Sequence, residues 1–276
     1  MNTRASLVLT LAVLLGGCAG TRMMTPQTAP WVQAEARQRM HQPIPEPRNI
    51  TLGSDQLAVV ERIDNRVLPA AIQVCRKSFR DSDEECERLL RGRTLDVRSG
   101  DNSINAFVGY DYDVTLLGGL ISAAGSDDEI AAVLAHEYSH ALLRHPQKAV
   151  ANRLGGMLIG AAVGAAVGAK KDDSRYVRLG AEAGVTVGSL VFSRSMELAA
   201  DHFGLFIMHE AGYDVRAAAQ FHIRMARLAS SGSSTNPGGF LGFLSTQPPP
   251  ERRVDKLIAA EEMISSGARR PIWKKQ

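Results

Sequence analysis

The stretch SDDEIAAVLAHEYSHALLRH, Ser126–His145, predicts a helix that carries chemistry. Ser126 is a preferred helix N-cap, and Glu129 three residues later is typical of a capping box. Because Pro146 disfavours helical backbone in the residue before it, we expect the helix to stop at His145. We interpret His145 as a cation at the helix C-terminus, where positive charge is favourable.

The same helix contains an HExxH motif made of His136, Glu137 and His140. Residues four apart share a helix face, so the two histidines can bind one metal ion. Glu137 lies beside that face and can deprotonate a metal-bound water. The motif also occurs by chance and needs a third ligand. The metzincin continuation is excluded, because Leu143 and Pro146 stand where it requires glycine and histidine.

A glutamate from a later helix can supply the third ligand. The downstream candidates are Glu182, Glu197 and Glu210. Glu197 stands out because Asp201 follows one helical turn later on the same face, where it can accept the second N–H of a ligand histidine. Three histidines could compete as ligands, although a packed or surface role is commoner for each: His202, His209 and His222.

Residues 1–17 are typical of a secretory signal, with an apolar run too short to span a bilayer. The sequence LGGC that ends at Cys18 resembles the bacterial lipobox, which implies that Cys18 is lipidated. Ala19 resembles the residue found in lipoproteins sorted to the outer membrane. Several acyl chains anchor stably, since each buried methylene contributes about 0.8 kcal/mol. An ordinary signal peptide that contains a cysteine is the alternative.

The remaining cysteines, Cys75 and Cys86, predict a disulfide in an oxidising periplasm, and its short loop would add roughly 3 kcal/mol. Two buried free thiols are the alternative. The charge balance of 32 basic to 29 acidic residues, with 5% aromatic residues, argues against a nucleic-acid partner.

We expect an α+β fold, mostly helical with a small β-sheet, in which HExxH lies on one helix and the glutamate ligand on a second. Residues 18–49 contain scattered prolines and are interpreted as a flexible tether, with a short helix around Val32–Met40. The metallopeptidase domain would occupy residues 50–276. The runs RTLDVRS and INAFVGY predict an antiparallel hairpin, and VTLLGGLI predicts a strand end followed by a helix.

Residues 147–190 are rich in glycine and alanine and predict a helical hairpin packed beside the cleft. Glycines recur every fourth residue: Gly156, Gly160, Gly164 and Gly168, then Gly180, Gly184 and Gly188. Each glycine inside a helix costs up to about 1 kcal/mol, which close backbone packing must offset. The uncharged run Leu154–Ala169 is shorter than the roughly 20 residues that span a bilayer. An interaction surface for a membrane or a partner assembly is the alternative.

Four motifs in order resemble the HtpX, BepA and LoiP group of gluzincin zinc metallopeptidases, relatives of the CAAX prenyl protease. They are INAFVGY, the opening stretch, SRSMELAADHFGLFIMHEAGYD and FLSTQPPPERRVDKL, and the resemblance covers Asp55–Ile264. It implies one zinc ion per chain at His136, His140 and Glu197. It also implies that Glu137 is the general base and that Asp201 supports the ligands.

The resemblance implies two further elements of the cleft. The strand with Asn105, Ala106 and Phe107 would be an edge to which substrate backbone adds. Arg253 would face the cleft and stabilise the oxyanion, or else form a surface salt bridge. Gln247 stands where many relatives have a histidine, and in some periplasmic relatives that histidine approaches the zinc and holds the site shut. Glutamine is a much poorer zinc ligand than imidazole, which argues against such a latch in this chain.

The leading hypothesis is a lipid-anchored zinc endopeptidase on the periplasmic face of the outer membrane. The resemblance implies that its substrates are misfolded or misassembled envelope proteins, with an outer-membrane assembly machinery or a second copy as partner. The alternative is a periplasmic chaperone or assembly factor whose cleft binds clients with little cleavage. A purely structural lipoprotein would leave Glu137, Glu197 and Asp201 unexplained.

Overall fold

The computed structural model describes residues 21–23, 25–47, 54–79, 83–171, 175–230 and 249–275. The chain divides into two units. The small unit joins the two chain ends, where β1 (Thr21–Met23) pairs antiparallel with β5 (Trp273–Lys275). The large unit spans Thr25–Arg270. The expected signal peptide, Cys18 and Gln247 lie outside the described residues.

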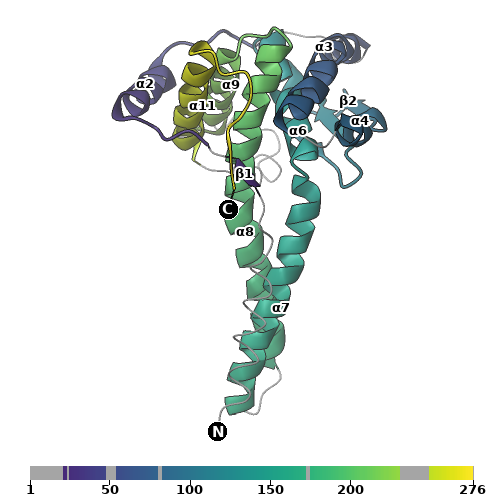
Figure 1. Cartoon of the computed structure of the whole chain (residues 1–276), viewed down its shortest axis with the longest axis vertical. Helices are drawn as coiled ribbons and strands as arrows, with labels where there is room; N and C mark the ends of the chain where they lie inside the picture. The colour runs from purple at the N-terminus through teal and green to yellow at the C-terminus, as the bar shows by residue number, and fades with distance from the viewer. Residues whose placement is uncertain are drawn as a thin grey trace. The chain divides into compact units, whose positions relative to one another are not determined.

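The large unit is mostly helical with one small sheet, which confirms the expected α+β class (Figure 1). Its described helices are α2 (Pro30–His41), α3 (Ser54–Ser78), α4 (Asp83–Arg91), α5 (Gly118–Ala123), α6 (Asp127–Leu142), α7 (His145–Lys171), α8 (Arg175–Glu210), α9 (Arg216–Ser230) and α11 (Pro250–Ser265). Its strands are β2 (Leu95–Arg98), β3 (Ala106–Val108) and β4 (Val114–Leu117).

The sheet has the strand order β2-β4-β3, so the predicted hairpin between the first two strands is wrong. β4 lies between them, parallel to β2 and antiparallel to β3. All four residues of β4 are buried, whereas β2 and β3 carry exposed or half-buried positions. The apolar run VTLL therefore takes the central place, because only there is it covered by neighbours. β4 leads directly into α5, as the sequence predicts.

The core of the large unit is built around the crossing of α6 and α8. Of the 16 residues of α6, 12 are buried. At Gly204 of α8, an added Cβ would lie 3.3 Å from the backbone of both Ala135 and His136. The missing side chain lets α8 approach the backbone of α6 closely. Ser126 accepts a hydrogen bond from the N–H of Glu129, so the predicted N-terminus of α6 is confirmed.

The helix expected in the tether is present as α2, but it is packed on the large unit. Val32 and Ala36 lie on one face and are buried, and Arg39 forms an ion pair with Glu261 of α11 at 2.9 Å. This part of residues 18–49 is therefore folded rather than a free tether. The apolar face of α2 is only two residues long, too short to distinguish by pattern from a proline-rich linker.

The structure joins Cys75 of α3 to Cys86 of α4 in a disulfide, with a Cα–Cα distance of 5.9 Å. Both cysteines are buried. The bond ties the short helix α4 to the long helix α3, which itself packs against α6. The disulfide thus stabilises the α3–α4 pair, which packs against the helix that carries the HExxH motif, α6.

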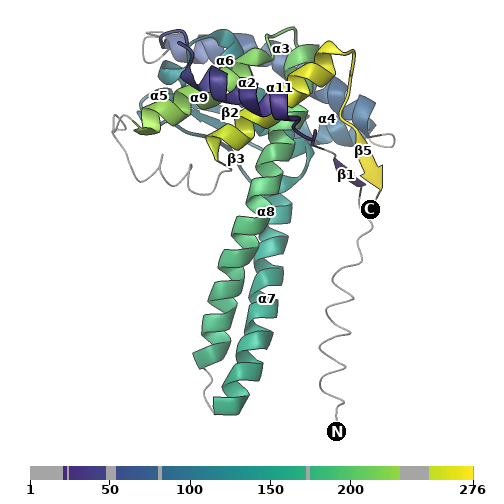
Figure 2. The same ribbon diagram turned by 90° about the vertical axis from the view of Figure 1, so that its left-hand side faces the viewer.

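The expected glycine-rich hairpin is formed by α7 and the first half of α8. Its predicted position beside the cleft is wrong, because the two helices extend together away from the packed helices (Figure 2) and the cavity next to the candidate ligands is lined by residues outside 147–190. An added Cβ at Gly164 would lie 1.9 Å from the carbonyl oxygen of Tyr176, and one at Gly180 would lie 2.1 Å from that of Gly160. The two backbones therefore touch where glycine occurs. Large apolar side chains are exposed along the hairpin: Val150, Leu154, Met157, Leu158, Ile159, Val163, Val167, Val177 and Leu179.

Candidate metal centre

Three potential ligand atoms converge where α6 crosses α8. The Nε2 atoms of His136 and His140 lie 2.9 Å apart. Glu197 of α8 places its two carboxylate oxygens 3.2 Å and 3.4 Å from the same two nitrogens. Helix α6 supplies both histidines on one face, and the close approach at Gly204 brings α8 within reach. Among the three glutamates considered from sequence, the structure brings Glu197 to the histidines.

This set of atoms fits a metal ion. Nε2 of His136, Nε2 of His140 and the carboxylate of Glu197 lie within 4.8 Å of one another, and each of these groups offers a lone pair when it binds a metal. Acceptors that converge in this way are unfavourable unless a cation lies between them. Two imidazoles and one carboxylate, with a position left open, are the ligand set of a catalytic zinc site. The residues present therefore fit zinc.

Asp201 holds the ring of His136 from the side opposite the ligand atoms. Its Oδ1 lies 2.9 Å from Nδ1 of His136, so a proton on Nδ1 leaves Nε2 free for a metal. Burial by itself would lower the pKa of His136, but its hydrogen bonds to Asp201 and Glu197 outweigh burial and raise that pKa to about 10. Without a metal the ring holds a second proton between these carboxylates, and a cation would take that place.

Arg253 is buried and forms a two-pronged contact with Asp201. Its Nε and Nη2 donate to the two carboxylate oxygens at 2.7 Å and 2.5 Å, and Nη2 lies 3.7 Å from Glu197. Burial alone would raise the pKa of Asp201, but the charge of Arg253 holds it well below its usual range. The surface salt bridge considered from sequence is wrong. Contact with the oxyanion stays a prediction.

Glu137 lies in the wall of a cavity beside the candidate ligands. Its carboxyl group is buried, and burial raises its pKa above the usual value. The cavity has a volume of about 40 Å³ and its lining includes His136, Glu137, Ala106, Val133, Met208 and Leu257. A carboxylate that binds a proton readily, beside a metal site and an apolar cavity, is placed to act as a general base.

His145 corrects the prediction of a C-terminal cation. Helix α6 ends at Leu142, Arg144 takes a positive φ of 55°, and His145 begins α7, with Pro146 in the first turn where proline is tolerated. His145 is buried, and its Nδ1 lies 2.8 Å from Nδ1 of His140. Burial lowers its pKa well below the usual value, so the ring is neutral. The turn at Arg144 changes the direction of the chain, so the side-chain direction expected for His145 in one continuous helix is wrong.

The other candidates from sequence lie elsewhere. Glu182 is exposed on the hairpin beside Arg178, and Glu210 forms an ion pair with Lys77. His202 is buried against Phe206, and His209 contacts Arg269. His222 of α9 was considered as a possible ligand, but it lies 3.5 Å from Asp201 and does not join the three converging ligand groups. Its contact with Asp201 is not predictable from the sequence, because nothing in the sequence links α9 to α8.

Strand β3 carries the residues expected to bind substrate backbone. Within the described ranges β3 pairs only with β4, so its other edge has no strand partner. Ala106 is buried and lines the cavity, whereas Phe107 is exposed. Asn105 precedes the strand, and its carbonyl oxygen accepts a hydrogen bond from the N–H of Leu117. The strand therefore lies at a sheet edge that adjoins the candidate site.

Two histidines four residues apart on one helix, a glutamate between them and a second glutamate from another helix define the centre of a metallopeptidase. Residues 84–261, more than half of the chain, match the family described as Peptidase family M48. The chain therefore belongs to peptidase family M48, and the names of its relatives support a metalloprotease.

Three relatives illustrate the match. A Vibrio cholerae protein whose name includes the words beta-barrel assembly-enhancing protease is 32% identical over 158 residues, which are 56% of this chain and 32% of that protein. The mitochondrial metalloendopeptidase OMA1 of Schizosaccharomyces pombe is 32% identical over 158 residues, covering 57% and 43%. The beta-barrel assembly-enhancing protease of Escherichia coli K12 is 27% identical over 157 residues, covering 55% and 31%. The chain thus spans less than half the length of these relatives.

Proposed function

We propose that this protein is a zinc-dependent endopeptidase. The observation that carries the proposal is the convergence of His136 Nε2, His140 Nε2 and Glu197 within hydrogen-bond distances of one another, with Glu137 in the adjoining wall. A bound zinc ion would polarise the scissile carbonyl and lower the pKa of a water molecule toward 7. Membership of family M48 supports the same assignment.

The residues of the chain divide the remaining work. Glu137 takes the proton of the attacking water and passes it to the leaving amine, a role that its raised pKa suits. Asp201, held by Arg253, fixes the tautomer and orientation of His136. The free edge of β3 binds extended substrate backbone, and the apolar cavity beside Glu137 takes a substrate side chain.

We further propose that the enzyme is lipid-anchored through Cys18 at the periplasmic face of the outer membrane. The lipobox-like sequence supports this location. The proposed substrates are misfolded or misassembled envelope proteins, and two relatives with the words beta-barrel assembly-enhancing protease in their names support that class. A role as an assembly factor that binds clients with little cleavage is the second candidate, supported by the exposed apolar side chains of the hairpin.

The test replaces Glu137 with Gln and measures casein cleavage and bound zinc. We expect cleavage to fall by on the order of 100-fold or more while zinc is retained, because the variant loses the base and keeps all three ligands. Glu182→Gln makes the same change at an exposed hairpin position and should cleave at the wild-type rate. Cleavage by Glu137→Gln at the wild-type rate would refute Glu137 as the general base, whereas a wild type that binds zinc but cleaves nothing would leave the assembly-factor role.

A further inference from the structure

His145 lies against the side of His140 that faces away from the other candidate ligands. Nε2 of His140 faces His136 and Glu197, whereas its Nδ1 lies 2.8 Å from Nδ1 of His145. The two rings meet edge to face, with centroids 4.8 Å apart and an interplanar angle of 73°. Two ring nitrogens at this distance share one proton, so His140 is held by a partner just as His136 is held by Asp201.

The direction of this hydrogen bond follows from metal binding. A neutral histidine that binds a metal through Nε2 carries its proton on Nδ1, so His140 donates and Nδ1 of His145 accepts. We propose that His145 is a positioning residue that fixes the tautomer and the ring orientation of His140 for zinc. The inference rests on the proposed zinc site, and it assigns to His145 a task that neither the motif spacing nor the ligand set requires.

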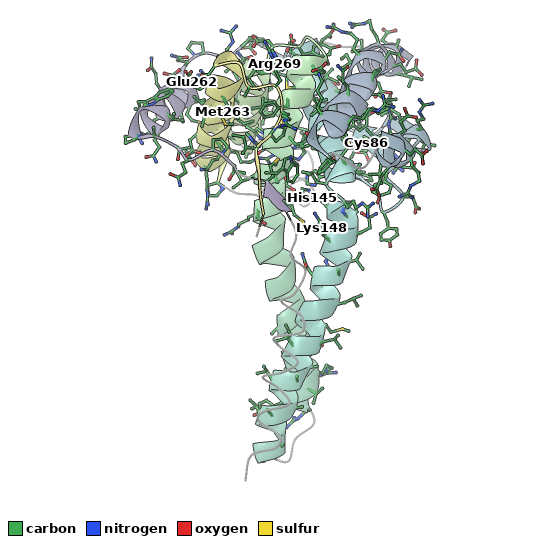
Figure 3. The ribbon with its side chains drawn as sticks, in the orientation of Figure 1. Cys86, His145, Lys148, Glu262, Met263 and Arg269 are labelled. Atoms are coloured by element: carbon green, nitrogen blue, oxygen red, sulfur yellow. A yellow bond between two sulfur atoms is a disulfide. The ribbon has the colours of Figure 1, made fainter. Side chains whose placement is uncertain are left out.

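His145 is held in place by contacts that do not involve His140. The preceding residue, Arg144, forms an ion pair with Glu85 of α4. Two residues after His145, the side-chain amide of Gln147 donates to the carbonyl oxygen of Tyr110 at 2.8 Å. Figure 3 shows His145 where α7 leaves the packed helices. Because the turn is fixed independently, the acceptor is already in position before a metal binds.

The two ligand histidines therefore have different supports. His136 is held by the carboxylate of Asp201, which is itself paired with Arg253. His140 is held by a neutral imidazole, which supplies an acceptor without adding another negative charge beside Glu137 and Glu197. A charged partner makes an imidazole ligand more basic than a neutral partner does. His145 would thus orient His140 and leave the site less negative than a carboxylate partner in the same position would.

The test compares zinc affinity in wild type, His145→Leu and His145→Asn, using a competing chelator and the visible spectrum of the cobalt-substituted protein. Leu removes the acceptor, whereas the Asn side-chain oxygen can occupy a similar position. We expect zinc affinity to fall 10- to 100-fold in His145→Leu with a changed cobalt spectrum, and to stay within about threefold in His145→Asn. The matched control is His202→Leu, because His202 is buried and the described part of the chain shows no hydrogen-bond partner for it; this variant should bind zinc like wild type.

Wild-type affinity in His145→Leu, or an equal loss in both His145 variants, would overturn the inference and show a packing role only. Wild-type protein that binds no zinc would instead refute the zinc site itself. If His145→Leu does not fold, nitrogen-15 NMR of the histidines in the zinc-loaded wild type decides the question. We expect a proton on Nδ1 of His140 and none on Nδ1 of His145, and the reverse would overturn the inference.

Discussion

The two halves of α8 show the same kind of sequence in opposite environments. From Leu198 to Met208 the helix is largely buried and packs against α6, and this half carries Glu197 and Asp201. In the half nearer Arg175, Val177 and Leu179 are exposed, and the backbone of this half touches α7 at Gly164 and Gly180. The presence of apolar residues therefore does not by itself determine which half of α8 is buried. The partner helix decided it.

Glycine serves both halves, with different consequences. Gly204 lets α8 approach α6 and so brings Glu197 to the two histidines, whereas Gly164 and Gly180 only bring the two hairpin helices together. The contact at Gly204 helps to form the candidate metal site, whereas the contacts at Gly164 and Gly180 hold the two hairpin helices together. The predictions below compare a change near the site with a matched change in the hairpin.

The largest expected difference concerns the two glutamates of α8. Glu197→Ala removes a proposed ligand and should leave the purified protein without bound zinc and without measurable peptidase activity, because two histidines alone hold the ion weakly. Glu182→Ala in the hairpin should retain one zinc ion per chain. Metal analysis after dialysis measures both. Full zinc content in Glu197→Ala would contradict the assignment of the third ligand.

The next difference concerns stability. Arg224 of α9 is buried and donates to both carboxylate oxygens of Glu129 at 2.9 Å, whereas Arg178 is exposed beside Glu182. Arg224→Met leaves a buried carboxylate uncompensated and should lower the free energy of unfolding by about 3–5 kcal/mol. Arg178→Met should change it by less than about 0.5 kcal/mol. Urea unfolding of both variants checks the contrast, which equal effects would contradict.

A third comparison tests whether the hairpin is coupled to the metal centre. Gly204→Val should push α8 away from α6 and weaken zinc binding by on the order of tenfold, an effect similar to loss of a ligand's support. Gly164→Leu should separate α7 from α8, which hydrogen exchange of the hairpin amides would detect, while zinc affinity stays within about threefold. If Gly164→Leu weakens zinc binding as much as Gly204→Val, the two regions act as one.

The last comparison depends on pH and concerns one buried histidine. Burial lowers the pKa of His202 to about 4, so between about pH 6.5 and 4 the unfolded chain binds a proton that the folded chain does not. This residue therefore makes stability fall by about 1.4 kcal/mol for each pH unit as the pH drops through that range, and it has no such effect above it. Metal-free His202→Leu should show a shallower acid loss of stability than the metal-free wild type. Parallel curves in urea titrations at pH 7 and 5 would contradict this.

The hairpin is also where a membrane could act. Residues 145–169 form one helix that is long and apolar enough to cross a bilayer by length and composition, which by itself is weak support. The exposed pair Arg178 and Glu182 flanks Gly180, which touches Gly160 in the middle of that helix. A bilayer that enclosed both helices would have to desolvate this ion pair, which is costly. That the exposed apolar side chains of the hairpin bind a membrane surface or a protein partner stays a prediction.

The sequence by itself determined the local features of this protein. The local features are the HExxH spacing, the Ser126 cap that starts α6, the choice of Glu197 through its partner Asp201 and the four-residue glycine repeat. They all follow from short-range helix geometry, which acts within a few residues. These features predicted the helical fold, the candidate ligands and the existence of the helical hairpin, but not that the hairpin extends away from the cleft.

Only the tertiary structure decided which distant groups meet. The central place of β4, the packing of α2, the contact of Arg253 with Asp201 and the contact of His145 with His140 depend on where whole elements pack. The turn at Arg144 shows the reason, because one residue with positive φ redirected a histidine that helical periodicity placed on the wrong side. Periodicity fixes the face of a helix on which a residue lies, and packing fixes what that face touches.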